Sequence, residues 1–176
     1  MWGPVVLGKL GRLRCALALP RADCVNKEKV DPMEFEHWNP KLAERFSSYV
    51  PDKGIDGYLG VRIDEFEAGR MVASFEVSDD MITMIGNIHG GCLSAFCDHV
   101  LGVVLYPVMP KGSWAATTEF KINLLRPVSG GTCTATAEVI SMSRTTAVIR
   151  IDVHNDGRLA AAAQGTCLLM APREDS

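Results

Sequence analysis

Residues 87–102 read NIHGGCLSAFCDHVLG. A histidine and two glycines precede an apolar segment. The hydrophobic residues of that segment recur at helical spacing and form one stripe: Leu93, Phe96, Cys97, Val100, Leu101 and Val104. The pattern predicts an amphipathic helix that begins after the glycines and buries this stripe. Pro107 and Pro110 end the apolar segment.

Asp98 is the unexpected residue in this helix, nine residues after His89. It lies off the apolar stripe, and the residues one or two turns from it are all small: Gly91, Ser94, Ala95 and Gly102. Such a face allows close approach of another backbone, a neighbouring subunit or a ligand. An acid that caps a loop, pairs with an arginine or faces water explains Asp98 equally well on its own. The combination with HGG is what marks the stretch as a candidate site.

The rest of the chain predicts an antiparallel sheet. Alternation and turn residues predict a helix after Asn39-Pro40, a loop at 54–57, and strands at 58–66, 70–78, 114–125, 132–142, 145–154 and 160–170. With hairpin-length connections, this order is typical of an α+β domain in which the sheet wraps around one long helix. Within 114–125 the alternation puts Thr117 on the polar face, away from the helix of its own chain.

Composition excludes several classes of function. The 176 residues are 47% hydrophobic and carry a formal net charge of -3, which argues against nucleic-acid binding. No apolar run is expected to approach the roughly 20 residues of a membrane span. The six cysteines form no CxxC pair and no zinc-like spacing with histidine, so we expect no metal and a reducing compartment, the cytoplasm.

The first 32 residues differ in composition from the remainder. Residues 1–22 contain four basic residues and no acid, as in a mitochondrial presequence, but they lack its serine enrichment. We therefore expect 1–32 to be an extension, 33–171 the folded domain and 172–176 a short tail. A presequence would instead direct the protein to the mitochondrial matrix.

These motifs resemble a known family. HGG with an aspartate nine residues after the histidine, followed by LLRP at 124–127 and GGTCTATAEV at 130–139, looks like the hotdog-fold acyl-CoA thioesterases of the phenylacetate-pathway (PaaI-like) group. The resemblance covers roughly residues 55–170. It implies the hotdog fold, hydrolysis of an acyl-CoA without a cofactor, and a site at a subunit interface.

Carried over by position, the resemblance assigns roles to four residues. Asp98 would be the catalytic carboxylate, acting as general base or as nucleophile. Gly90 would offer its backbone N–H to the thioester oxygen, and His89 would help to position that carbonyl group. Thr117 would orient the attacking water, and its place on the polar strand face implies that it does so across a dimer interface.

The substrate-binding residues are less well defined. Many relatives have an asparagine six residues before the histidine, where this chain has Thr83, and Asn87 instead lies two residues before it. Gly91 would allow the substrate to approach the backbone closely. Arg126 and Arg144 are candidates for holding the anionic coenzyme A.

The chemistry is also sound without the family. A helix N-terminus has unpaired N–H groups and a positive dipole end, which suit a developing oxyanion. A thiolate leaves readily, so no general acid is essential. We expect a homodimer, paired further into a tetramer. Two other functions remain open: a non-catalytic acyl-CoA-binding or regulatory protein, and a hotdog hydratase or dehydratase, whose His-Phe-Pro-Gly type signature is missing here.

Overall fold

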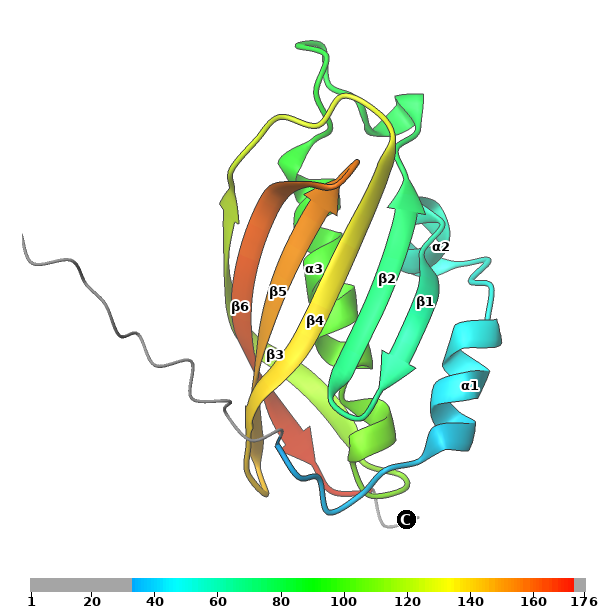
Figure 1. Ribbon diagram of the computed structural model, residues 1–176, viewed down its shortest axis with the longest axis vertical. Coiled ribbons are helices and arrows are strands. Elements are labelled where there is room, and N and C mark those ends of the chain that lie inside the picture. The colour runs from blue at the N-terminus through cyan, green and yellow to red at the C-terminus, as the bar shows by residue number, and fades with distance from the viewer. Residues whose placement is uncertain (1–32, 173–176) are drawn as a thin grey trace, which may run out of the picture. The chain divides into compact units, whose positions relative to one another are not determined.

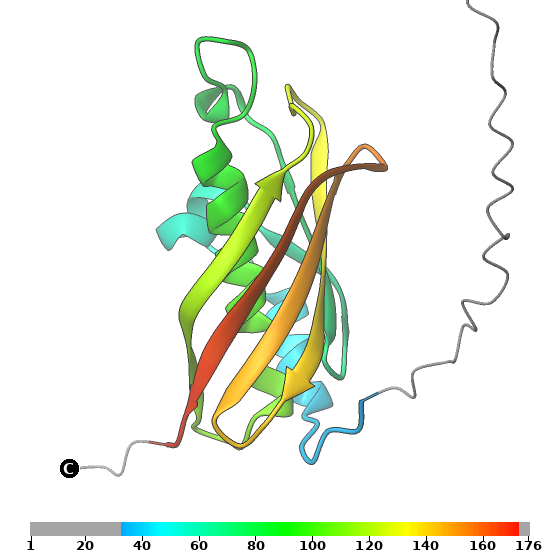
Figure 2. The same cartoon turned by 90° about the vertical axis from the view of Figure 1, so that its left-hand side faces the viewer.

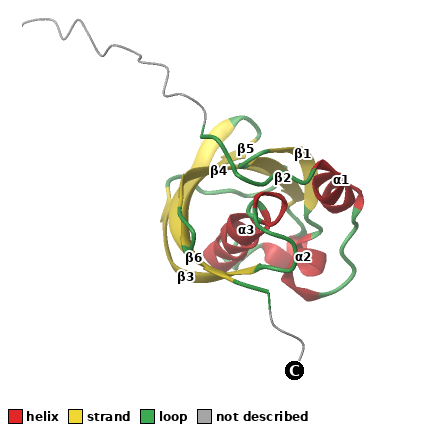
Figure 3. Ribbon diagram, turned by 90° about the horizontal axis from the view of Figure 1, so that it is seen from below, coloured by secondary structure: helices red, strands yellow, loops and turns green. Residues whose placement is uncertain are grey.

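The computed structural model describes residues 33–172, so the expectations for 1–32 and 173–176 lie outside the described residues. The elements are α1 (Pro40–Ser48), α2 (Gly54–Leu59), β1 (Arg62–Glu67), β2 (Arg70–Glu76), η1 (Asp79–Met81), α3 (Gly90–Val103), η2 (Tyr106–Val108), β3 (Trp114–Leu124), β4 (Thr132–Met142), β5 (Thr146–Asn155) and β6 (Arg158–Met170). Six antiparallel strands in the order β1-β2-β4-β5-β6-β3 form one sheet that curves around α3 (Figures 1 and 3). The predicted α+β architecture is confirmed.

The apolar stripe of α3 is buried as predicted. Phe96, Val100 and Leu101 are completely inaccessible to solvent, because the concave face of the sheet covers this side of the helix. The ring of Phe96 packs edge-on against Phe75 of β2, with 4.8 Å between the ring centroids. Aromatic pairs in this geometry stabilise a core beyond the area they bury. The burial of one side of α3 therefore fixes which residues its other side presents.

The segment that begins with α3 is longer and more apolar than expected, since no apolar run was expected to approach the length of a membrane span. Gly90–Val108 is 19 residues long with a mean hydropathy of 1.5, which is long and apolar enough to cross a membrane by length and composition alone. Half of this segment is buried inside the fold. Packing of α3 in the core accounts for its composition without a bilayer.

The segment before β1 differs from the prediction. The expected loop at 54–57 is the helix α2, and the strand expected from residue 58 begins only at Arg62. Gly60 adopts a left-handed conformation (φ 66°) and donates its N–H to the carbonyls of Asp56 and Gly57, which ends α2. A helix of six residues is too short to show a hydrophobic period, so the two glycines in residues 54–57 favoured a loop. By contrast α1 begins as predicted, with the Asn39 side chain accepting the Leu42 N–H.

The predicted orientation of Thr117 is wrong. Thr117 pairs with Cys167 in β6 but Glu119 pairs with Thr166, so Thr118 is an extra residue that reverses the alternation of β3. Directly paired residues share a face, and Cys167 is fully buried in the core. The Thr117 hydroxyl Oγ1 lies 3.9 Å from Cys167 Sγ. Thr117 therefore projects toward α3 of its own chain.

One edge strand of the sheet is contacted by a helix, and the other has an unpaired outer edge. The outer edge at β1 contacts α1. Strand β3, eleven residues long, pairs only with β6 within the described residues, so its outer edge presents unpaired backbone groups. This edge lies beside α3, as Figure 2 shows. It is a ready surface for pairing with another strand.

The packing of α3 on the sheet predicts the effect of one substitution. A Cβ at Gly165 of β6 would lie 2.6 Å from Cβ of Phe120 and would also meet the Leu101 side chain of α3. We expect Gly165→Ala to lower the free energy of unfolding by about 1–3 kcal/mol, because the crowded core must shift. Urea unfolding monitored by circular dichroism measures this change.

Gly130→Ala is the matched control, because a Cβ there meets no atom within 4 Å. Equal stability of the two variants would show that the helix does not press on the sheet at Gly165.

Candidate functional site

The first turn of α3 carries an unusual cap. His89 is the N-cap residue, and its ring Nδ1 accepts the Gly91 N–H at 2.9 Å. Because Nδ1 accepts a hydrogen bond, the neutral ring carries its proton on Nε2, which is left as a donor. The Gly90 N–H donates to no described residue, whereas the Cys92 N–H is satisfied by the His89 carbonyl. One backbone donor at the positive end of α3 is therefore free.

Both glycines lie close to a side chain that an added Cβ would displace. A Cβ at Gly91 would lie 2.8 Å from Nδ1 of His89, which would push the capping ring away. A Cβ at Gly90 would lie 2.7 Å from Cδ1 of Leu124 at the end of β3. The GG dipeptide thus permits the histidine cap and the approach of β3.

The turn before α3 is held by its backbone. The Thr83 hydroxyl and the Thr83 N–H both donate to the Asn87 carbonyl, at 2.9 and 2.8 Å. The His89 N–H donates to the Met81 carbonyl at 2.8 Å. Thr83 and Asn87, both expected to contact substrate, therefore act together in shaping the turn. Of the two, Thr83 lines a pocket beside His89.

Asp98 lies further along α3, off the buried stripe and on the exposed side of the helix. It makes no hydrogen bond or ion pair with any residue in the described range 33–172. The charge of Asp98 nevertheless affects the Cys167 thiol. Burial raises the pKa of Cys167, the hydrogen bond to Thr117 lowers it, and the negative charge of Asp98 raises it further. Thr117 therefore contacts a thiol that also experiences the negative charge of Asp98.

His99, beside Asp98 on α3, is a further titratable group. Burial lowers its pKa, while the charges of Asp56 and Asp98 act in the opposite direction. Its ring therefore favours the neutral form.

The site residues fall into two groups on the same helix. We call His89, Gly90 and Gly91 the cap half-site, and Asp98 and Thr117 the carboxylate half-site. Asp98 follows Gly90 by eight residues in α3, which corresponds to about 12 Å along the axis. One thioester carbonyl cannot contact both half-sites of a single chain.

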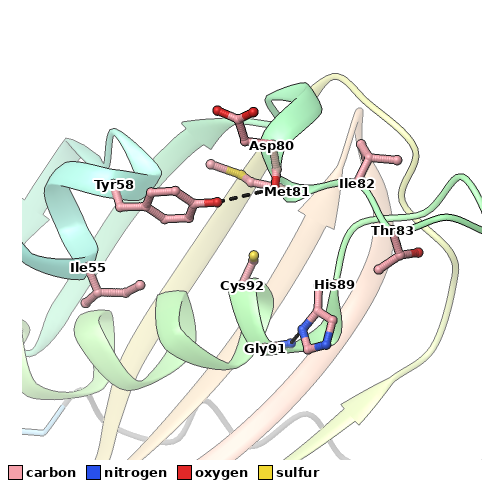
Figure 4. A pocket seen from close by; sticks show the side chains of 9 residues that line it. All are labelled: Ile55, Tyr58, Asp80, Met81, Ile82, Thr83, His89, Gly91 and Cys92. Atoms are coloured by element: carbon pink, nitrogen blue, oxygen red, sulfur yellow. Dashed lines mark hydrogen bonds between the residues drawn. The ribbon is translucent and has the colours of Figure 1, made fainter.

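A pocket of about 380 Å³ opens beside the cap half-site (Figure 4). Its lining comes from α2, η1, the following turn and the first turn of α3: Ile55, Tyr58, Asp80, Met81, Ile82, Thr83, His89, Gly91 and Cys92. The sequence analysis missed the contribution of α2, because residues 54–57 were predicted to be a loop and Tyr58 to begin a strand. The spacing of Ile55 and Tyr58, three residues apart, is the only signal that indicated a shared helical face.

The two arginines expected to hold coenzyme A are separated. Arg126 follows β3 on the side of the cap half-site, and its guanidinium donates to the Leu159 carbonyl. Arg144 lies in the β4–β5 turn at the other end of the sheet, where it lines a different pocket of about 720 Å³. Within residues 33–172 no cluster of three or more His, Cys, Asp or Glu side chains is suited to a metal ion.

Comparison with known proteins agrees with this architecture. Residues 85–162 match the model of the thioesterase superfamily. A medium/long-chain acyl-CoA thioesterase from Salmonella typhimurium is 24% identical over 140 residues, covering 69% of this chain and 86% of the relative.

Two solved structures share the fold. A thioesterase from Haemophilus influenzae superposes with a TM-score of 0.69 at 22% identity, covering 81% of this chain and 98% of its own. A hypothetical thioesterase from Streptococcus pneumoniae, solved with coenzyme A, superposes with a TM-score of 0.60 at 28% identity, covering 65% and 88%.

The histidine cap can be tested by a double-mutant cycle. We expect Gly91→Ala to lower the free energy of unfolding by about 1 kcal/mol, because the new methyl group displaces the capping ring. In a His89→Ala background the same change should cost nothing, since the ring is already gone. Urea unfolding of the four proteins measures the coupling. Strictly additive effects would contradict the cap.

Proposed function

We propose that this chain, a member of the thioesterase superfamily with the hotdog fold, hydrolyses an acyl-CoA to the free acid and coenzyme A. The observation that carries the proposal is the free Gly90 N–H at the start of α3, on the same helix as the unpaired carboxylate of Asp98. The acyl-CoA thioesterase from Salmonella and the coenzyme A bound to the Streptococcus protein support the substrate class.

The cap half-site is suited to polarising the thioester. The Gly90 N–H and the positive end of the α3 dipole stabilise the charge that develops on the carbonyl oxygen. The Nε2–H of His89 supplies a second donor beside it. Because these groups are fixed by the cap before substrate binds, little reorganisation opposes the reaction.

The carboxylate half-site supplies the attacking group. Asp98 either removes a proton from water or attacks the carbonyl carbon directly, forming an anhydride that water then cleaves. The Thr117 hydroxyl, on the face of the sheet that is turned toward α3, holds the water against the Asp98 carboxylate. The coenzyme leaves as a thiolate, which needs no general acid.

The separation of the half-sites requires two subunits. We assign the Gly90 N–H of one subunit and Asp98 of its partner to one thioester. A two-fold axis that pairs the free edges of β3 would set the two α3 helices side by side and antiparallel. The small residues Gly91, Ala95 and Gly102 on the exposed face of α3 allow this close approach. Pairing of dimers into a tetramer would leave such a site unchanged.

This arrangement corrects the role first given to Thr117. It was expected to serve Asp98 across the interface, but the bulge in β3 directs it to the helix of its own chain. In the proposed dimer the elements that cross the interface are the cap half-site and the carboxylate half-site.

Two other functions would use the same fold. A non-catalytic acyl-CoA-binding protein requires neither the free Gly90 N–H nor Asp98, and a hydratase or dehydratase leaves the thioester intact. Release of free thiol from an acyl-CoA distinguishes hydrolysis from both. The four described cysteines are free thiols, which is compatible with a reducing compartment such as the cytoplasm.

Replacement of Asp98 tests the proposal. Asp98→Asn keeps the shape of the side chain but removes the basic oxygen, so we expect kcat to fall by about 10² to 10⁴. The melting temperature should change little, because Asp98 has no hydrogen bond or ion pair to lose among residues 33–172. Thiol release and thermal unfolding are measured on the same preparation.

Asp64→Asn is the matched control, an exposed aspartate on β1 at the far edge of the sheet. It should leave kcat unchanged. An Asp98→Asn protein that melts early yet hydrolyses normally per folded molecule would refute the catalytic role.

A further inference from the structure

We propose that the pocket between α2 and the start of α3 receives the acyl group of the substrate, and that Tyr58 determines which acyl groups it accepts. This inference rests on the proposed thioester hydrolysis. It assigns to α2 a role in selecting the substrate.

The position of the pocket favours this assignment. His89 and Gly91 of the cap half-site line it, on either side of Gly90 in the sequence, whose backbone N–H would bind the carbonyl oxygen. Cys92, the next residue, lines it from the first turn of α3 (Figure 4). An acyl chain is bonded directly to the carbonyl carbon, so it must enter a space that begins beside the oxyanion donor.

The pocket wall has unfilled apolar surface. Ile55 and Tyr58 lie one turn apart on α2 and are 47% and 53% exposed, although both face the pocket. Met81 and Cys92 form more buried parts of the same lining. An apolar group bound here would remove this surface from water, at about 25 cal/mol for each Å² covered.

The charges around the pocket favour the acyl group over the coenzyme. Asp80 lines the pocket, Asp79 lies beside it in η1, and Asp56 lies on α2. These carboxylates repel the phosphates of coenzyme A. The uncharged acyl group carries no such penalty, so the thioester is oriented with its acyl end toward α2 and its coenzyme away from it.

The volume and Tyr58 together limit the size of the acyl group. At about 380 Å³ the pocket lies near the lower end of the range for small-molecule sites, with room for roughly a dozen water-sized groups. The Tyr58 ring reaches from α2 to η1, where its hydroxyl donates to the Asp80 carbonyl at 3.3 Å (Figure 4). We expect this ring to leave room for an acyl group with a single aromatic ring or a medium-length chain and to obstruct a long chain.

A substrate panel tests the role of Tyr58. Thiol release is measured with phenylacetyl-CoA, octanoyl-CoA and palmitoyl-CoA. We expect the wild type to have its lowest kcat/KM on palmitoyl-CoA. Tyr58→Ala opens the end of the pocket and should raise the palmitoyl-to-octanoyl ratio of kcat/KM by about tenfold or more.

Two variants serve as controls in this panel. Tyr58→Phe keeps the ring and should keep the wild-type ratio. Tyr49→Ala removes an exposed tyrosine at the end of α1 that lines neither pocket, and it too should keep the ratio. A ratio unchanged in Tyr58→Ala would overturn the role assigned to Tyr58.

A second readout does not depend on hydrolysis. Cys92 is a free, partly exposed thiol in the pocket lining, whereas Cys97, Cys133 and Cys167 are buried. Alkylation of Cys92 by iodoacetamide, followed by peptide mass spectrometry, reports whether the pocket is filled. The octanoyl thioether analogue of the substrate, which cannot be hydrolysed, should slow this labelling, and free coenzyme A should not.

The two readouts separate the two proposals. Protection of Cys92 by the analogue without thiol release from any substrate would refute hydrolysis and support the acyl subsite. Thiol release that is unaffected in Tyr58→Ala, with Cys92 labelled equally with and without the analogue, would refute the acyl subsite and leave hydrolysis standing.

Discussion

The burial of one side of α3 against the sheet positions every candidate site residue on that helix. Because Phe96, Val100 and Leu101 are drawn into the core, the opposite side of the helix, with Asp98 and its small neighbours, must face outward. The same packing brings the start of α3 against the end of β3, where Gly90 meets Leu124. The packing of α3 against the sheet therefore positions both half-sites and leaves them accessible to a partner subunit.

Much of this follows from local patterns in the sequence. The stripe of α3, the cap of α1 at Asn39 and the outward position of Asp98 each depend on neighbours within a few residues along the chain. Such features are visible in a single sequence because helical periodicity and capping are local. The resemblance of the HGG motif and the spaced aspartate to the thioesterases is visible for the same reason.

Features that depend on pairing between distant segments were not predicted. The bulge at Thr118 arises from the register of β3 against β6, and it changed which face carries Thr117.

The helix α2 is too short for periodicity, so the pocket it forms with the first turn of α3 was missed, together with Tyr58. Arg144 was grouped with Arg126 by composition alone, and the sheet places it at the other end of the molecule.

In the proposed dimer the Gly90 N–H and Asp98 act on one substrate from different subunits. Mixed dimers test this arrangement most directly, formed by co-expressing differently tagged chains, one with Gly90→Pro, which lacks the N–H, and one with Asp98→Asn. If the site is shared, each mixed dimer has one intact site, and thiol release returns to about half the wild-type rate per dimer while both parent homodimers stay inactive. Mixed dimers as inactive as the two parents would contradict the shared site.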